Sequence, residues 1–262
     1  MKPFYEQQKP VRINHQSQLD FPLHLHNAVE IIYVLKGSSV ACCEAQRFAL
    51  GPGDLFVAFP NQIHGYEKTE DFDGYVLVVT AENLSVFKSI LEEYQPTTPH
   101  LHPTDEDAQN FAALFRLMHS DRNTSSPALL QGYGQVLFSK LLPLITLVRK
   151  VSTGDALQAV LYYIGSHYTE PITRKEIARA VGYSESHVSH MISQSLGTTL
   201  SGYITMLRMD EARRLLRETT LSVGQIAMSL GFSSVRSFNR FFMLQMYQTP
   251  TAYRKQIRKD PT

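Results

Sequence analysis

One short pattern occurs twice in this chain of 262 residues, and its two copies lie 49 positions apart. Each copy has an Ile-Ala pair, a glycine four positions later, an aromatic residue and a serine: Ile177, Ala178, Gly182, Tyr183 and Ser184, then Ile226, Ala227, Gly231, Phe232 and Ser233. Similarity at a fixed period over this many positions indicates an internal repeat. The chain must therefore build one supersecondary unit twice.

Both copies carry the signals of two helices joined by a short turn. A hydroxyl residue precedes Glu or Gln by three positions, which is the spacing of a capping box: Thr173 with Glu176, and Ser222 with Gln225. The glycine then predicts a tight turn, and Ser184 or Ser233 is expected to cap the second helix. Two helices in this order form the outline of a helix-turn-helix.

In a helix-turn-helix the second helix enters the major groove of DNA and presents its first residues to the bases. The polar residues predicted there are Ser186, His187, Ser189 and His190 in the first copy, and Arg236, Ser237, Asn239 and Arg240 in the second. Arg236 and Arg240 are four positions apart and share a helix face, which suits guanine or phosphate contacts. The alternative is that the two arginines only form a solvent-exposed helix face, and we favour the interpretation that they contact DNA.

The charge distribution and the segment between the repeats support this interpretation. Residues 1–154 carry 12 Lys and Arg against 16 Asp and Glu, whereas residues 155–262 carry 13 against 8. A net charge of +1 therefore hides an acidic front and a basic rear that suits a polyanion. A continuous helix over residues 203–217 is expected to connect the two units rigidly.

The rear of the chain resembles the DNA-binding domain of the AraC-type regulators over about 100 residues. The residues that carry the resemblance follow the two copies: Leu207-Arg208-Met209 and Glu211-Ala212, then Leu230-Gly231-Phe232, Ser237-Phe238, Arg240-Phe241-Phe242, Thr249-Pro250 and Tyr253-Arg254. Two departures are Met243-Leu244, where the family usually has a Lys pair, and Tyr247, where it usually has Gly. The second puts a helix C-cap in doubt, since non-glycine residues disfavour positive φ. The resemblance implies base or backbone contacts from six of the polar residues named above: Ser186, Ser189, His190, Arg236, Ser237 and Arg240.

The front of the chain is typical of β structure followed by helices. Residues 29–34 and 75–80 are rich in β-branched and aromatic residues between turn signals, which predicts an antiparallel sandwich or barrel over about 80 residues. A helix is expected from Asp105 to Met118 behind Thr104. A second, opened by Ser126-Pro127, is expected to run to about Arg149. Its apolar circumference fits either a dimer contact or burial within its own domain.

His24, His26, Glu30 and His64 have the spacing of the two cupin motifs, and AraC-type proteins commonly place a cupin-like barrel before their DNA-binding domain. The resemblance implies two alternatives. These residues either bind a divalent transition metal or line an effector pocket together with Tyr33 and Tyr66, and the family favours the pocket. A saccharide is the expected effector because the resemblance points to regulators of carbohydrate use.

The sequence thus predicts an α+β protein of two domains. Residues 1–150 would form a cupin-like ligand-binding domain with a helical dimerisation segment, and residues 155–260 an all-α domain of two helix-turn-helix motifs joined by a linker helix. Residues 152–155 would link the two domains. We expect a cytoplasmic homodimeric transcription factor that is not an enzyme and binds double-stranded DNA, a small molecule and, if an activator, RNA polymerase.

The alternative function is a cupin metalloenzyme, a dioxygenase or isomerase, with an accessory helical domain.

Other features narrow the class of protein further. The first residues show no secretory signal, and the most apolar stretch is too short to span a bilayer. The adjacent Cys42 and Cys43 are expected to be reduced and buried, because neighbouring strand residues point to opposite faces.

Overall fold

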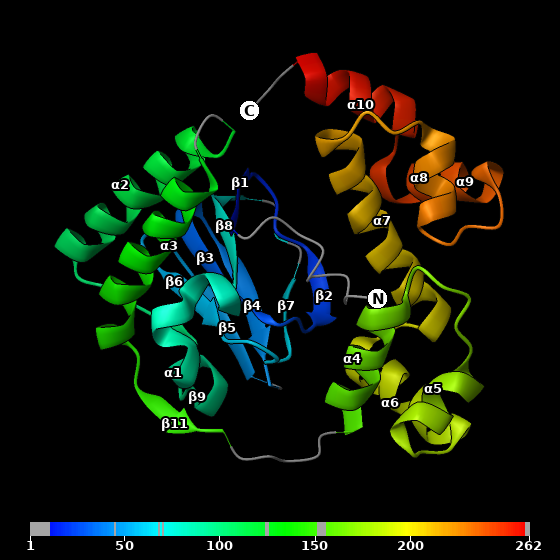
Figure 1. Cartoon of the computed structure of the whole chain (residues 1–262), viewed down its shortest axis with the longest axis horizontal. Coiled ribbons are helices and arrows are strands. Elements are labelled where there is room, and N and C mark those ends of the chain that lie inside the picture. The colour runs from blue at the N-terminus through cyan, green and yellow to red at the C-terminus, as the bar shows by residue number, and fades with distance from the viewer. Residues whose placement is uncertain are drawn as a thin grey trace. The chain divides into compact units, whose positions relative to one another are not determined.

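The computed structural model describes residues 11–44, 46–67, 69, 71–123, 126–150 and 156–259 (Figure 1). The described residues up to Gln158 form one compact unit, and those from Ala159 onward form another. The expected linker at residues 152–155 and the first ten residues lie outside the described ranges. No helix in the described part of the chain has the length and apolar character needed to cross a membrane.

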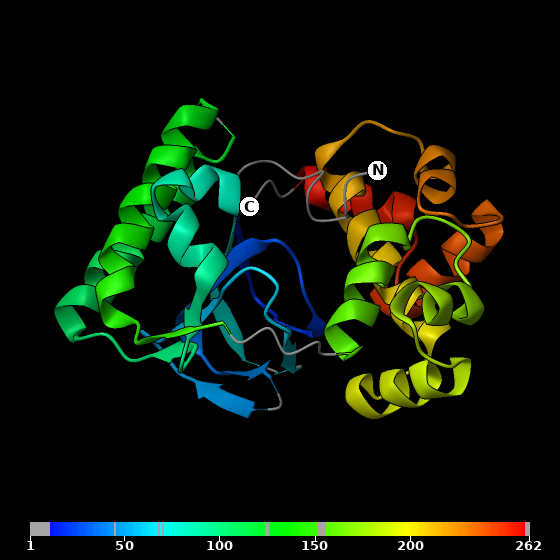
Figure 2. The ribbon, with the colours of Figure 1, turned by 60° about the horizontal axis from the view of Figure 1, so that its bottom comes forward.

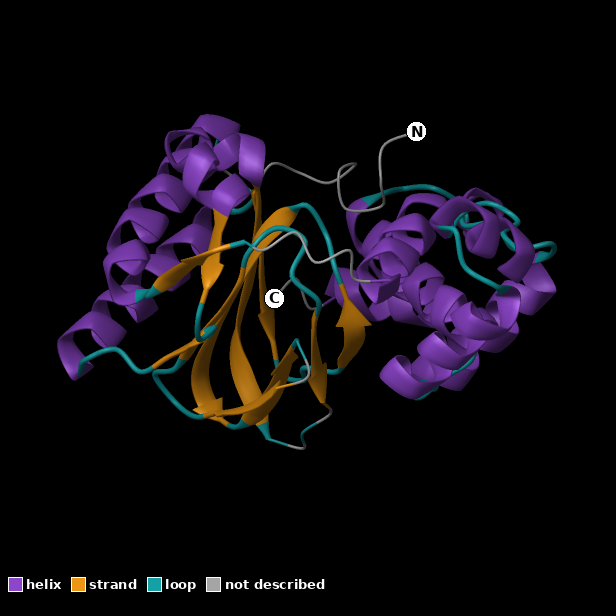
Figure 3. Cartoon of the chain, turned by 90° about the horizontal axis from the view of Figure 1, so that it is seen from below, coloured by secondary structure: helices purple, strands orange, loops and turns teal. Residues whose placement is uncertain are grey.

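The front unit contains two antiparallel sheets that face each other (Figure 3). The five-stranded sheet has the order β1 (Val11–Gln16), β8 (Phe72–Thr80), β3 (Ala28–Gly37), β6 (Leu55–Ala58) and β10 (His100–Leu101). The four-stranded sheet has the order β2 (Phe21–His24), β7 (His64–Glu67), β4 (Ser39–Cys43) and β5 (Gln46–Leu50). The strands expected at residues 29–34 and 75–80 are confirmed, and they pair with each other.

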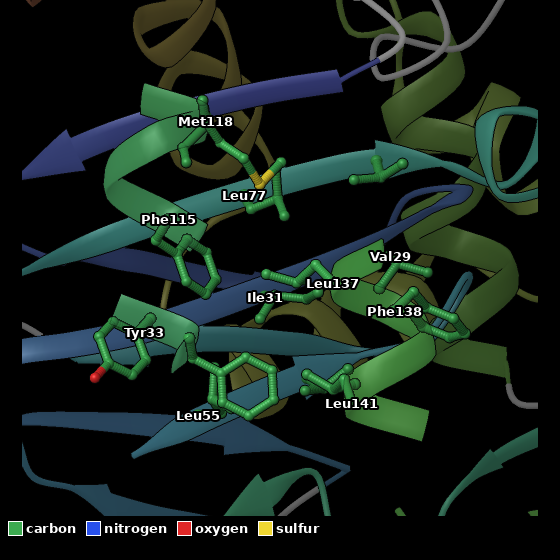
Figure 4. Packing of buried hydrophobic residues seen from close by; sticks show 14 of the residues in the cluster. Val29, Ile31, Tyr33, Leu55, Leu77, Phe115, Met118, Leu137, Phe138 and Leu141 are labelled. Carbon is green, nitrogen blue, oxygen red and sulfur yellow. The ribbon is translucent and has the colours of Figure 1, made fainter. Parts of the chain in front are cut away.

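The two faces of β3 belong to two different cores. Ile32 and Val34 pack between the two sheets, whereas Ile31 and Tyr33 face the helices that cover the five-stranded sheet (Figure 4). Successive strand residues point to opposite faces, so a strand between two layers is apolar on both. This explains why residues 31–34 form a continuous apolar run rather than an alternating pattern.

Helices α2 (Asp105–Asp121) and α3 (Pro127–Leu141) cover the outer face of the five-stranded sheet. The expected caps are confirmed, because the side chains of Thr104 and Ser126 accept from the backbone N–H groups of Asp107 and Leu129. A short 3-10 helix η2 (Ala81–Phe87) and α1 (Lys88–Glu93) precede them, and β9 (Tyr94–Pro96) follows α1.

The expectation that the second of these helices continues to Arg149 is wrong. Helix α3 ends at Leu141, a 3-10 turn η3 (Leu142–Leu144) follows, and β11 (Leu147–Arg149) pairs with β9. Pro143 explains the stop, since proline cannot donate to the helical hydrogen-bond ladder and its ring clashes with the preceding turn. Both cysteines are free thiols; Cys43 is buried, but Cys42 is only half-buried.

The rear unit is helical throughout its described residues (Figure 2). Its helices are α4 (Ala156–His167), α5 (Arg174–Val181), α6 (Glu185–Leu196), α7 (Leu200–Glu218), α8 (Val223–Ser229), α9 (Val235–Met246) and α10 (Pro250–Lys259). Both capping boxes are present, and Gly182 and Gly231 have positive φ angles of 75° and 73°. The α5–α6 and α8–α9 pairs are thus the two predicted helix-turn-helix units, and α7 is the predicted connector.

One predicted cap differs by a single residue. Ser184 caps α6 as expected, but α9 is capped by Ser234 rather than by Ser233. The hydroxyl of Ser234 accepts from the backbone N–H of Ser237, so α9 begins one residue later than the repeat predicts. The 49-residue period therefore holds for the first helix and the glycine turn and then slips by one.

Candidate nucleic-acid interface and ligand cluster

The exposed surface of α6 carries most of the polar residues predicted for the first unit. Ser186, His187 and His190 are exposed, while Val188 and Ile192 on the opposite face are buried. The His187 ring stacks on Tyr183, with 5.0 Å between centroids. Ser189 is half-buried, and its hydroxyl accepts a hydrogen bond from Arg174 Nη1 at 3.1 Å. Arg174 on α5, to which no sequence motif points, therefore extends the polar surface of this unit.

The corresponding face of α9 is basic. Arg236, Asn239 and Arg240 are exposed, and the two arginines lie one turn apart. The guanidinium carbon of Arg240 lies 4.8 Å from the centre of the Phe241 ring, which orients the side chain by a cation–π contact. Ser237 differs from the others, because its hydroxyl donates to the Ser234 carbonyl at 2.8 Å and so belongs to the cap.

Arg208 on α7 connects the two helix-turn-helix units, a role that the sequence analysis missed. Its guanidinium donates to three backbone carbonyl oxygens: Tyr168 at 2.6 Å, Glu170 at 3.0 Å and Gly231 at 3.0 Å. The first two precede α5, and the third lies in the turn between α8 and α9. The planar guanidinium thus holds the turn between α8 and α9 next to the segment that precedes α5. The sequence held one signal of this role: Arg208 lies between two apolar residues of α7, both of which are buried.

The cupin-type residues of the front unit converge in the space between its two sheets. His24 ends β2 opposite His64 at the start of β7, Glu30 lies in β3, and His26 lies between β2 and β3. One ligand atom from each lies within 4.8 Å of every other. The cupin-type spacing in the sequence therefore does bring these side chains together, but the reason is tertiary: they come from β2 and the residues after it, from β3 and from β7.

Hydrogen bonds hold the imidazoles of this cluster in defined orientations. His24 Nδ1 and His64 Nδ1 donate to the carbonyl oxygens of Pro22 and Gln62, each at 2.9 Å. A carbonyl can only accept, so the Nδ1 of each of these two rings carries a proton. Buried His64 Nε2 makes no hydrogen bond within the described residues, and Glu30 Oε1 lies 3.6 Å away.

The charge states of this cluster suit a cation. Burial lowers the pKa of His24, as does the nearby His64, and burial also lowers the pKa of His26. Burial raises the pKa of Glu30, but the hydrogen bond from His26 and the electrostatic effect of the nearby His64 outweigh it and hold that pKa well below its usual value. Neutral imidazoles beside an ionised carboxylate are the forms that bind metals.

Of the two tyrosines predicted to line a pocket, only Tyr66 lies at this cluster. Its hydroxyl donates to Glu30 Oε1 at 2.6 Å. Tyr33 lies on the other face of β3, where its hydroxyl donates to the Ala108 carbonyl at 2.8 Å and its ring stacks on Phe115 (Figure 4). Its separation from Glu30 is an odd number of strand positions, which places the two side chains on opposite faces.

A sheet domain with a buried polar cluster, followed by two helix-turn-helix units, defines a class of protein: ligand-binding regulators of transcription. Residues 11–138 match the model of the AraC-like ligand binding domain, and residues 177–256 match that of a helix-turn-helix domain. The chain belongs to the AraC family of transcription regulators. These matches point to a DNA-binding regulator and not to an enzyme.

Curated relatives agree with this assignment. An uncharacterized HTH-type transcriptional regulator of Staphylococcus aureus is 26% identical over 259 residues, covering 93% of this chain and 33% of the relative. The chain thus spans about a third of that relative's length. The HTH-type transcriptional activator RhaS of an Enterobacter species is 25% identical over 249 residues, covering 91% of this chain and 89% of the relative.

Two solved structures of ToxT from Vibrio cholerae show the same fold. An apo variant superposes with a TM-score of 0.61 at 14% identity, covering 94% of this chain and 97% of that one. The wild-type protein with a bound unsaturated fatty acid gives a TM-score of 0.53 at 16% identity, covering 93% and 94%. At this level of identity the likeness concerns the fold alone.

Proposed function

We propose that this protein is a sequence-specific DNA-binding regulator of transcription that responds to a small-molecule effector. The observation that carries the proposal is the pair of exposed polar helix faces on α6 and α9, joined through α7 and Arg208. Ser186, His187, Ser189 and His190 would contact one major groove, and Arg236, Ser237, Asn239 and Arg240 the next. Two grooves on one face of DNA are about 34 Å apart.

A gel-shift titration with double-stranded DNA from upstream of the neighbouring operon tests the DNA proposal. Affinity should fall steeply as salt rises, because Lys and Arg displace counterions from phosphates. A DNA fragment that carries the binding sequence of only one helix-turn-helix unit should bind the protein far more weakly than a fragment that carries both. Absence of binding even at low salt would overturn the proposal.

For the front unit we propose a small-molecule effector, and a saccharide in particular. The family resemblance to regulators of carbohydrate use supports the saccharide, whereas the fatty-acid-bound ToxT structure makes a fatty acid the competing class. Thermal-shift screening against a panel of sugars and a panel of fatty acids separates the two. A ligand that binds only the native state raises the melting temperature, and the rise grows with ligand concentration relative to its Kd. A response to fatty acids alone would contradict the saccharide.

The geometry of the buried cluster favours a metal ion over a bulky ligand at that position. His24, His26, Glu30 and His64 are all buried, and the carbonyl partners of two imidazoles resemble the outer-shell bonds of metal-ligating histidines. These four residues would hold a divalent transition metal, which when bound would act as a Lewis acid or a structural link. An effector would then contact Tyr66 and the rim of the two sheets.

Homodimerisation through α3 completes the proposal. Leu129 and Val136 on this helix are exposed, at seven residues' spacing on one face, and Gly132 lies between them with open space beside it. A second copy of the same helix would cover this stripe. RNA polymerase would be a further partner if the protein activates transcription.

A further inference from the structure

A second cluster of imidazole and carboxylate groups lies at the edge of the five-stranded sheet. Asp54 ends the turn that leads into β6, and His100 begins β10, which pairs with β6. His102 follows β10 just before α2 begins. Four strand positions separate Asp54 from Ala58, which pairs with Glu30, so roughly 13 Å of strand separates this group from the His24 cluster.

The three side chains already converge on one point. His100 Nε2 lies 3.0 Å from Asp54 Oδ2, and His102 Nδ1 lies 2.7 Å from Asp54 Oδ1. The two imidazole centroids are 4.1 Å apart, and one ligand atom from each residue lies within 4.8 Å of the others. In a tetrahedral zinc site with bonds of about 2.0–2.1 Å, neighbouring ligand atoms are about 3.3 Å apart. Small side-chain movements would reach that spacing.

The backbone holds the carboxylate in place. Gly51 N–H donates to Asp54 Oδ2 at 2.7 Å, and Asp54 N–H donates to the Gly51 carbonyl at 3.1 Å. Gly53 has a φ of 89°, a conformation that favours glycine, and it closes the turn by donating to the Val34 carbonyl. Burial raises the pKa of Asp54, but the bonds from Gly51, His100 and His102 outweigh it and lower that pKa.

We infer that Asp54, His100 and His102 bind a divalent transition metal of the zinc, nickel or cobalt type. Two imidazole nitrogens and one carboxylate oxygen form a three-ligand set that leaves a position for water. The site has one exposed side: the His102 side chain is 71% exposed, against 11% for His100 and 12% for Asp54. A metal ion can therefore enter from solvent onto two fixed ligands.

The bound ion would add a stronger link between two segments that β-pairing and the hydrogen bonds of Asp54 to His100 and His102 already join at this edge. Asp54 belongs to the β5–β6 turn, whereas His100 and His102 belong to the segment that leads into α2. Thr104, the N-cap of α2, is two residues beyond His102. Metal would thus fasten the start of the helical layer to the sheet. The metal ion would therefore stabilise the front unit, and this effect would be separate from that of the effector.

Zinc titration of the full chain by calorimetry, with thermal melting in parallel, tests the inference. We expect His102→Ala to weaken binding at this site by at least about tenfold, since even outer-shell partners contribute that much. The variant should also lose the part of the zinc-dependent rise in melting temperature that belongs to this site. Because His102 is exposed, its removal leaves the metal-free fold intact.

His15→Ala is the matched control, since His15 is another exposed histidine bonded to a carboxylate, Asp73, at 2.7 Å. It should leave zinc binding unchanged. Anomalous scattering at the zinc edge from crystals grown with zinc then locates the ion. Density between Asp54, His100 and His102 supports the inference. Density at the His24 cluster alone, or equal binding by wild type and His102→Ala, overturns it without touching the proposal for that other cluster.

Discussion

Arg208 Nη1 donates a hydrogen bond to the carbonyl oxygen of Gly231 at 3.0 Å, and this contact ties α7 to the turn of the second helix-turn-helix. The same guanidinium holds the segment before the first unit through Tyr168 and Glu170. Its ring partner is Phe232, whose centre lies 5.5 Å from the guanidinium carbon. One side chain outside the predicted DNA-contacting set therefore joins the two helix-turn-helix units.

Arg208→Met should lower the free energy of unfolding of the rear unit by about 3 kcal/mol, because three half-buried carbonyls lose charged donors. It should also weaken binding to a full DNA site more than to a half-site, since the two helices lose their fixed spacing. Urea unfolding and gel shifts measure both effects. Arg217→Met, at an exposed position of the same helix, is the control. Equal loss on full and half-sites would contradict the positioning role.

Tyr247→Gly should raise the free energy of unfolding by roughly 0.5–1 kcal/mol. Tyr247 adopts the left-handed C-cap of α9 with a φ of 55°, and its side chain is 87% exposed, so little packing is lost. Left-handed backbone costs a non-glycine residue about 1–2 kcal/mol, and the flexibility of glycine in the unfolded chain returns part of this. Tyr247→Ala keeps the strain and should bring no gain. If both variants are equally stable, strain is not the cause.

Arg240→Ala should weaken specific DNA binding by about 1–3 kcal/mol and relax the preference at one base position. The stacking on Phe241 presents a guanidinium in a fixed plane, which suits two bonds to guanine. Competition gel shifts against a library of single-base variants measure the change. Arg240→Lys retains the positive charge but not the two parallel N–H donors of the guanidinium. DNA binding by this variant should therefore keep its salt dependence and lose its preference for one base. Uniform weakening across all sequences would indicate a phosphate contact instead.

His119→Gln should flatten the acid side of the stability profile. Burial, together with Arg122 and His15, lowers the pKa of His119 from 6.5 to about 4. Between these values the unfolded chain binds more protons than the folded one, so the free energy of unfolding falls as pH falls from about 6.5 to about 4. Urea midpoints at pH 7.5 and pH 5 measure the difference. The exposed His190→Gln is the control, and an unchanged profile in His119→Gln would refute the assignment.

Val136→Asp should convert a dimer into monomers without unfolding them. Val136 is 50% exposed on the outer stripe of α3, so the charge meets water in the monomer and an apolar surface in the proposed dimer. Light scattering after size exclusion gives the mass. Asn110→Asp, an exposed change on α2, should leave the mass of the dimer unchanged. A wild-type chain that is monomeric at high concentration would reject the interface.

Local signals determined the rear unit almost completely. The capping boxes at Thr173 and Ser222, the glycine turns and the apolar spacing each depend on contacts within one or two helical turns. Such contacts are encoded in neighbouring residues, so the sequence by itself predicts them. The slip of the cap from Ser233 to Ser234 marks the limit, because the exact start of a helix depends on how its core-facing residues fit.

The sequence by itself thus indicated the repeat, the family and the four cupin-type residues His24, His26, Glu30 and His64 that lie together in the structure. Only the tertiary structure decided that Tyr33 faces away from that set, that α3 stops at Leu141, and that Arg208 joins both helix-turn-helix units. It also brought Asp54 to His100 and His102, which lie 46 and 48 positions further along the chain. These relations depend on which face of a strand is covered and which segments pair, and contacts between distant segments leave no periodic trace in the chain.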